Sequence, residues 1–146
     1  KFDSIVISDF DESLKSVVTS LLYTDVSPKK KYFITLNQWF DESLLNEKTI
    51  QPLYYPSINK KNLDDFNNKF SKKFNIKPNH LTLLSYDLLG LIYYLSLKSD
   101  LSNPNDLFKN KNSFKGKIGI FDIQNNKINH KLNFYKIENG MIKEIF

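Results

Sequence analysis

The residues best suited to chemistry lie where predicted elements begin or end. Asn37, Gln38 and Trp39 follow an apolar run, so they place two amides and an indole at the end of a predicted strand. Tyr86 and Asp87 lie in the first turns of a long apolar helix. Open α/β sheets bind ligands at the carboxyl ends of their strands, and this pattern therefore favours a ligand-binding site.

Each of these side chains also has a structural interpretation. Asn37 can cap its own loop or the turn that follows it. Trp39 can stack on a ligand, anchor an interface or lie in the core. Asp87 can face a ligand or accept hydrogen bonds from nearby backbone amides. The sequence leaves these alternatives open.

Asp9 and Phe10 begin the first predicted helix at the carboxyl end of a strand, where free N–H groups favour anions. Further acids follow at once in Asp11 and Glu12. Helix capping is therefore the expected role of Asp9.

Groups arranged for catalysis are missing from the sequence pattern. The histidines, His80 and His130, are isolated, and the neighbouring acids Asp41 and Glu42 are not a positioned acid and base. The four glycines do not have phosphate-loop spacing. We therefore expect no catalytic residue, no metal ligand and no cofactor, and the protein is not expected to be an enzyme.

Composition bounds the class of protein. The 146 residues are 40% hydrophobic, which is enough apolar material for a domain-sized core. The net charge of +5 comes from lysine without any arginine, which indicates a biased composition and not a nucleic-acid partner. The absence of cysteine excludes disulfides, and no apolar run reaches the roughly 18 residues of a membrane span.

The first third of the chain predicts a βαβ unit. A β-branched run at 4–7 has the pattern of a buried strand, a helix with one apolar face follows, and Val26-Ser27-Pro28 ends it. The next strand spans 32–36, parallel to the first. A helical turn at 44–47 and a strand from Ile50 to Tyr55, ended by Pro56, complete this part.

The middle of the chain is predicted to be helical. Leu63, Phe66, Phe70 and Phe74 form one apolar stripe of an amphipathic helix. The residues 80–97 are apolar nearly all round, so this helix is expected to be packed on several sides. A short helix is predicted from 104 or 105 to about 109.

The tail has the patterning of strands. Strands are predicted at 117–123, 128–137 and 141–146, with turns between them and antiparallel pairing. Asn139-Gly140 predicts a two-residue hairpin.

The order of these pieces resembles the C-terminal half of type I periplasmic binding proteins of the leucine-binding type. The matching pieces lie at 2–7, 53–56, 66–74, 85–87 and 114–121, the last with phenylalanine and glycine in the order Phe-x-Gly-x-x-Gly-x-Phe. Trp39-Phe40-Asp41 and the Tyr-Tyr-Pro before the amphipathic helix resemble penicillin-binding protein activators most.

This resemblance implies an α/β fold of the type I periplasmic binding protein kind, with a parallel βαβ unit, helices and a C-terminal antiparallel hairpin region. Residues 1–53 and 132–146 would belong to the C-terminal lobe, and 54–131 to the N-terminal lobe. The first halves of both lobes would be absent, and the chain begins without methionine, so we expect a fragment of a two-lobed protein. Apolar side chains such as Val6, Ile34 and Leu89 would then remain exposed.

The resemblance also implies a function. The first expectation is a non-catalytic interaction module of the bacterial cell envelope that activates a peptidoglycan synthase, that is, a penicillin-binding protein. The alternative is the substrate-binding protein of an ABC transporter, which would deliver an amino acid or another small polar solute to its permease. Either would be periplasmic or anchored to the outer membrane. Transport receptors often carry an acid where Asn37 lies, and this difference favours the first. The side chains expected to line one cleft between the lobes are Asp9, Phe10, Asn37, Gln38, Trp39, Tyr86 and Asp87.

Overall fold

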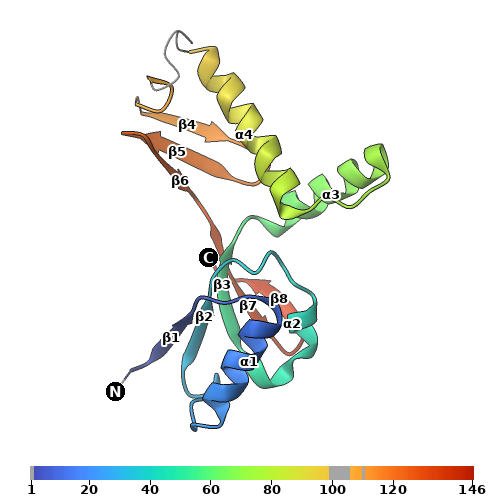
Figure 1. Cartoon of the computed structure of the whole chain (residues 1–146), viewed down its shortest axis with the longest axis vertical. Helices are drawn as coiled ribbons and strands as arrows, with labels where there is room; N and C mark the ends of the chain where they lie inside the picture. Colours follow the sequence, from blue (N-terminus) through green and yellow to red (C-terminus); the bar gives the residue numbers. More distant parts are fainter. Residues whose placement is uncertain (1, 99–105, 110) are drawn as a thin grey trace. The chain divides into compact units, whose positions relative to one another are not determined.

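The structure is a computed structural model that describes residues 2–98, 106–109 and 111–146. The chain forms two compact units (Figure 1). Unit 1 comprises Lys1–Ser57 and Asn133–Phe146, and unit 2 comprises Ile58–Leu132. The α/β class predicted from the sequence is confirmed.

Unit 1 is built on a sheet of mixed direction. Its strands have the order β1-β2-β3-β7-β8, in which β1, β2 and β3 are parallel and β7 and β8 are antiparallel to their neighbours. The predicted parallel βαβ unit is therefore confirmed. Along the chain the elements are β1 (Ser4–Ile7), α1 (Asp11–Leu22), β2 (Tyr32–Thr35), α2 (Ser43–Asn46), the 3₁₀ turn η1 (Lys48–Ile50), β3 (Leu53–Ser57), β7 (Asn133–Glu138) and β8 (Met141–Glu144).

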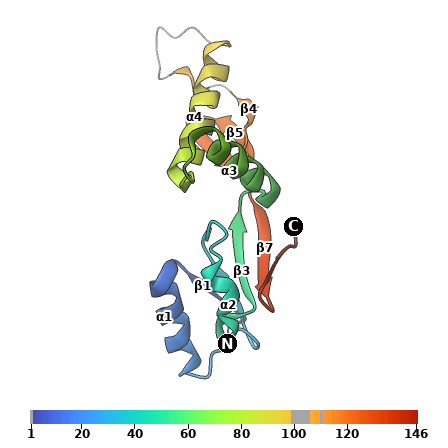
Figure 2. The ribbon, with the colours of Figure 1, turned by 90° about the vertical axis from the view of Figure 1, so that its right-hand side faces the viewer.

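The core of unit 1 lies between one face of this sheet and its helices. Two right-handed crossovers in the same direction place α1 and α2 on the same side of the sheet (Figure 2). Phe33, Leu53 and Tyr55 on that face are fully buried. On the other face Val6 is 66% exposed, so the predicted buried character of β1 holds for one face only.

Three boundaries in this unit differ from the prediction. The helix α1 ends at Leu22, before the predicted stop at 26–28. Ile50 is not in a strand, because it packs as the last residue of η1, and β3 begins after Pro52. Pro56 does not end β3 but lies within it, paired with Phe134 of β7. It is tolerated because β3 has no pairing with β2 beyond Tyr54.

Unit 2 combines two helices with an antiparallel sheet of three strands in the order β4-β5-β6. Asn59 caps α3 by accepting from the N–H of Asn62 at 3.1 Å, and Asn79 caps α4 by accepting from the N–H of Thr82 at 2.9 Å. In chain order the elements are α3 (Lys60–Phe74), α4 (His80–Ser96), β4 (Asn112–Lys115), β5 (Ile120–Gln124) and β6 (Lys127–His130).

The helix α4 is not packed on several sides, contrary to the prediction. One stripe is buried, formed by Leu83, Asp87, Leu91 and Leu95, and it packs along the β4–β6 sheet (Figure 1). Leu89 on another side of the helix is 68% exposed. An apolar pattern around the whole helix does not show which of its sides meets the sheet. Besides the buried stripe, Tyr86 of α4 contacts Phe66 of α3. The predicted exposure is confirmed for Val6 and Leu89, whereas Ile34 is half-buried.

The tail also departs from its predicted boundaries. The predicted strand 128–137 divides, because β6 pairs with β5 in unit 2 whereas β7 pairs with β3 in unit 1. The strand predicted from 117 begins at Ile120, after a turn in which the N–H of Gly116 donates to Gly119 O at 2.8 Å. The Asn139-Gly140 hairpin between β7 and β8 is confirmed. The strand β4 pairs antiparallel with β5, and this hairpin contains the piece at 114–121 that the family resemblance had matched. Residues 104 and 105 of the predicted short helix lie outside the described residues, and Asp106 to Lys109 form a turn.

Candidate functional site

The ends of the three parallel strands of unit 1 are joined by side chains of the loops that follow them. Gln38 is buried, and its Nε2 donates to Asp9 O at 3.0 Å and to Leu36 O at 3.2 Å. This connects the loop after β2 to the loop after β1. Asn37 Oδ1 accepts from Ser57 Oγ at 2.7 Å, which connects the same loop to the end of β3. We call residues 37–41 the Trp39 loop.

The Trp39 loop is held on both sides of its tryptophan. Before it, Asn37 Oδ1 also accepts from the backbone N–H of Trp39 at 2.9 Å. After it, Phe40 is only 8% exposed and its ring packs against Tyr135 at 4.9 Å between centroids. Asp41 then accepts from the N–H of Ser43, the first residue of α2, at 2.9 Å.

The backbone of this loop is strained at its centre. Trp39 and Phe40 have φ angles of 50° and 59°, and such left-handed conformations cost a non-glycine residue about 1 kcal/mol or more. Trp39 itself is half-buried and is not a core residue. The strained loop that carries Trp39 therefore follows β2 at the carboxyl edge of the sheet, and strained backbone of this kind clusters at binding sites.

Asp9 and Phe10 lie beside this loop at the start of α1. Asp9 accepts from the N–H of Phe10 at 3.0 Å and from Ser13 Oγ at 2.8 Å, so its carboxylate stabilises its own turn. Phe10 is 43% exposed. The expected capping role of Asp9 is not found, because Phe10 is the N-cap residue of α1 and no side chain caps this helix. The accessible group of the pair is the aromatic ring of Phe10.

Asp87 has a defined structural role in unit 2. It is 3% exposed, and its two carboxylate oxygens accept from the backbone N–H groups of Lys117 and Ile118 at 2.7 and 2.8 Å. A Cβ on Gly116 would lie 2.2 Å from one of these oxygens, so this position needs glycine. Tyr86 is 53% exposed, and its ring meets Phe66 edge-on at 5.4 Å.

The predicted site residues thus form two groups. Asp9, Phe10, Asn37, Gln38 and Trp39 lie at one edge of the sheet in unit 1, whereas Tyr86 and Asp87 lie on α4 in unit 2. The first group is brought together by hydrogen bonds within unit 1. Convergence of both groups on one cleft remains a prediction.

Two polar residues that position this region escaped the sequence analysis. Ser57 is fully buried and donates to Asn37, but a serine at the end of a strand carries no signal of such a partner. Gln51 is buried, donates to Leu44 O at 3.0 Å and accepts from the N–H of Gly140 at 2.9 Å. It joins α2 to the β7–β8 hairpin. Only the tertiary fold reveals either contact.

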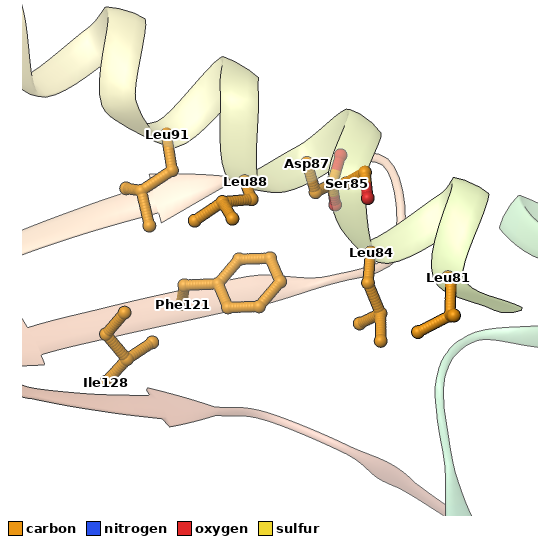
Figure 3. A pocket seen from close by; sticks show the side chains of 8 residues that line it. All are labelled: Leu81, Leu84, Ser85, Asp87, Leu88, Leu91, Phe121 and Ile128. Atoms are coloured by element: carbon orange, nitrogen blue, oxygen red, sulfur yellow. The ribbon is translucent and has the colours of Figure 1, made fainter.

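An apolar pocket of about 270 Å³ lies between α4 and strands β5 and β6 (Figure 3). Leucine side chains of α4 point toward Phe121 and Ile128 in this view. Its polar lining consists of Ser85 and Asp87, and both Asp87 oxygens are already hydrogen-bonded. The pocket is therefore not suited to a polar solute.

Within residues 2–98, 106–109 and 111–146, no cluster of three or more His, Asp or Glu side chains could hold a metal ion. In the same described part of the chain, no helix is both long and apolar enough to cross a membrane.

His130 on β6 is a half-buried titratable group of unit 2. Its ring stacks on Phe121 at 4.3 Å, and its Nε2 has no hydrogen-bond partner among the described residues. A Cβ on Gly119 would lie 2.6 Å from this nitrogen, and Gly119 has a φ of 156°. Burial lowers the pKa of His130 below its ordinary value of 6.5, opposed by a backbone hydrogen bond at Ile118 and by the charge of Asp87.

We expect unit 2 to lose stability in mild acid because of His130. Above pH 6.5 the imidazole is neutral in both the folded and the unfolded chain, so it has no effect on the free energy of unfolding. As the pH falls below 6.5 toward the lowered folded pKa, the unfolded chain takes up the proton first. The free energy of unfolding should therefore decrease from pH 7.5 to pH 5, and less so in His130→Gln. Urea denaturation at the two pH values measures this free energy. Equal decreases in the wild type and in His130→Gln would contradict the role of His130.

Comparison with known proteins supports the fold. No protein-family model matches the chain, and no curated protein matches it. Among solved structures, it is similar to an extracellular ligand-binding receptor from Desulfohalobium retbaense, with a TM-score of 0.66 and 15% identity over 98% of this chain and 26% of that chain. A leucine-binding protein from Thermotoga maritima has a TM-score of 0.65 and 15% identity over 99% of this chain and 44% of its own. An ABC transporter substrate-binding protein from Desulfitobacterium hafniense, in complex with Leu, has a TM-score of 0.59 and 18% identity over 98% of this chain and 43% of its own.

These similarities define the fold. The chain has the α/β fold of type I periplasmic binding proteins, as its sequence resemblance implied. It spans less than half the length of each of these structures. The resemblance to penicillin-binding protein activators in particular remains a prediction.

Proposed function

We propose that the chain belongs to a non-catalytic binding protein of the cell envelope and that the Trp39 loop recognises its ligand. The observation that carries this proposal is the half-buried Trp39 on a loop fixed on both sides by Asn37 and Phe40. A rigid aromatic side chain loses little entropy when it binds, so it makes an effective contact for a ligand or partner. The fold of ligand-binding proteins supports the same location.

The two compact units fit a two-lobed binding protein. We assign residues 1–53 and 132–146 to part of the C-terminal lobe, and 54–131 to part of the N-terminal lobe. The boundaries between the two observed units lie after Ser57 and after Leu132, within a few residues of these assigned boundaries. The protein would be periplasmic or anchored to the outer membrane, as the binding proteins of this fold suggest.

Solute recognition is the first candidate function. The similar structures include a leucine-binding protein and a substrate-binding protein in complex with Leu. A small polar solute, such as an amino acid, would be delivered to an ABC permease. The carboxylates of the site are used within the loops, since Asp9 binds Ser13 and Asp41 binds Ser43. A ligand ammonium group would therefore have to be neutralised elsewhere, or the ligand would be neutral.

The second candidate is an activator-like interaction module whose partner is a peptidoglycan synthase. One observation favours it. Asn37 is a neutral side chain where transport receptors often carry an acid, and its oxygen is occupied by Ser57 and by the N–H of Trp39. The indole would then bind a protein surface instead of a zwitterion. A catalytic role is not part of either candidate.

Calorimetry of the full-length protein against the twenty amino acids tests these functions. For a solute receptor we expect micromolar binding of at least one amino acid, and Trp39→Ala should weaken it about 30-fold, as for an interface residue worth about 2 kcal/mol. Tyr23→Ala is the matched control, because Tyr23 lies in unit 1 and is 88% exposed at the end of α1.

Absence of amino-acid binding, together with capture of a soluble penicillin-binding protein that Trp39→Ala abolishes, would support the interaction module. Binding of either kind that is equal in wild type and Trp39→Ala would contradict the role of the Trp39 loop.

A further inference from the structure

Unit 2 carries a continuous series of aromatic rings on α3 and α4. Phe74, Phe70 and Phe66 are spaced by four residues on one face of α3, with ring centroids 4.6 and 5.7 Å apart. Tyr86 of α4 extends the series, edge-on to Phe66 at 5.4 Å. The series changes from buried to exposed, since Phe66 is 8% exposed but Phe74 is 52% and Tyr86 is 53% exposed.

These rings form the apolar lining of a pocket of about 380 Å³, which we call the aromatic pocket. This volume lies within the usual range for small-molecule sites. Its lining includes Lys69 and Lys73 of α3, and Lys117 from the turn before β5. The backbone of Lys117 is fixed by Asp87, whose carboxylate accepts its N–H at 2.7 Å.

The charge of the aromatic pocket is unbalanced. Three lysines line it, and Asp65 is the single acid in its lining. Within the part of the chain that the structure describes, Lys69, Lys73 and Lys117 form no ion pair. Lys73 Nζ lies 5.3 Å from the centre of the Phe74 ring, so this ammonium group is already at the aromatic surface.

A helix face that only packs against apolar neighbours would not need lysines around its rings. Lysines at the rim of a pocket can also lay their aliphatic stems on apolar surface and keep the ammonium group in water, and this arrangement requires no ligand. Here, however, they surround a concave aromatic surface from two different elements. A bound molecule with an anionic group would reduce the repulsion between the lysine ammonium groups. The apolar part of the same molecule would cover the exposed rings.

We propose that the aromatic pocket binds a small aromatic carboxylate. Its ring would pack against Phe70 and Phe74 in offset or edge-to-face geometry, and its carboxylate would pair with Lys69, Lys73 or Lys117. This site lies wholly in unit 2 and does not depend on recognition at the Trp39 loop.

Titration of the full-length protein with indole-3-acetate, followed by calorimetry, tests the charge requirement. The matched neutral probe is indole-3-acetamide, which has the same ring and nearly the same shape. We expect the carboxylate to bind about tenfold more tightly than the amide, with an advantage that decreases at high salt. Equal affinities for the two probes, or no binding of either, would overturn the proposal.

Variants locate the binding within the pocket. Lys69→Gln and Lys73→Gln should each weaken indole-3-acetate about threefold, the usual size of one partly exposed charge pair. Lys72→Gln is the control, because Lys72 is an exposed lysine of the same helix outside the pocket lining. Phe70→Leu should weaken both probes, whereas Tyr23→Ala in unit 1 should change neither. An effect of Lys72→Gln as large as that of Lys73→Gln would show unspecific attraction and overturn the proposal.

Discussion

Replacement of Asp87 by alanine is expected to lower the free energy of unfolding of unit 2 by about 3 kcal/mol. The carboxylate is nearly inaccessible to water and accepts two backbone N–H groups, from Lys117 and Ile118. The alanine variant would leave the buried N–H of Ile118 and the part-buried N–H of Lys117 without this partner. An unsatisfied buried donor costs roughly 1–3 kcal/mol, and the part-buried one costs less. Asp87→Asn keeps one acceptor oxygen and should lose less.

Hydrogen exchange provides the local measurement for Asp87. The amides of Lys117 and Ile118 should exchange much faster in Asp87→Ala, while urea denaturation reports the overall loss. Asp64→Ala is the control, because Asp64 is a half-exposed acid of the same unit in a helical pair with Lys60. It should cost no more than about 0.5 kcal/mol. Unchanged exchange at Lys117 and Ile118 would show that these hydrogen bonds are not the role of Asp87.

Replacement of Phe40 by alanine is expected to destabilise unit 1 by about 3 kcal/mol. Its ring meets Tyr135 at 4.9 Å and Tyr55 at 5.9 Å, both edge-on, and these two tyrosines stack at 5.9 Å. Burial also raises the pKa of the Tyr55 phenol well above its usual range, which reflects how thoroughly water is excluded there. Loss of the Phe40 ring would leave a cavity beside two fully buried tyrosines.

Trp39 fluorescence can follow this change during urea denaturation, because Trp39 is the single tryptophan of the 146 residues and lies in unit 1. Phe10→Ala is the control, since Phe10 is 43% exposed in the same unit and should cost less than half as much. A loss below 1 kcal/mol for Phe40→Ala would mean that the aromatic cluster does not hold the Trp39 loop.

The local pattern was sufficient for most of the elements and for the parallel βαβ unit. Short β-branched runs, a one-sided helix and the Asn139-Gly140 turn each depend on neighbouring residues, and the structure confirms all three. The predicted boundaries were wrong where pairing with other strands, and not the local sequence, determines where a strand ends. Pro56 stays in β3 because its partner is β7, and 128–137 divides because its two ends pair with different sheets.

Some matching pieces of the family resemblance also prove to be one structural feature. Asp87 binds the turn within the Phe114 to Phe121 segment, and Gly116 is required beside its carboxylate. Residues 85–87 and 114–121 therefore occur together for a physical reason: a buried carboxylate satisfies a turn that only glycine can bring close to it. The sequence alone could not show this contact across 30 residues.

The candidate site was predictable in its location but not in its internal contacts. A strand followed by Asn37, Gln38 and Trp39 indicated the carboxyl edge of the sheet, and the structure places all three there. The sequence did not indicate that Gln38 would be buried with its amide nitrogen bound to two carbonyls. Nor did it indicate that Ser57 would donate a hydrogen bond to Asn37 Oδ1. Such contacts depend on which strand ends become neighbours, which is a property of the tertiary fold.

The role of the Trp39 loop is tested most directly by a fluorine NMR spectrum of the full-length protein labelled with fluorotryptophan. The resonance of position 39 is assigned by its loss in Trp39→Phe. During addition of the amino acid or soluble penicillin-binding protein that binds in calorimetry, the account predicts that this resonance shifts in proportion to the bound fraction. A resonance that stays unchanged while the ligand saturates the protein would contradict recognition at the Trp39 loop.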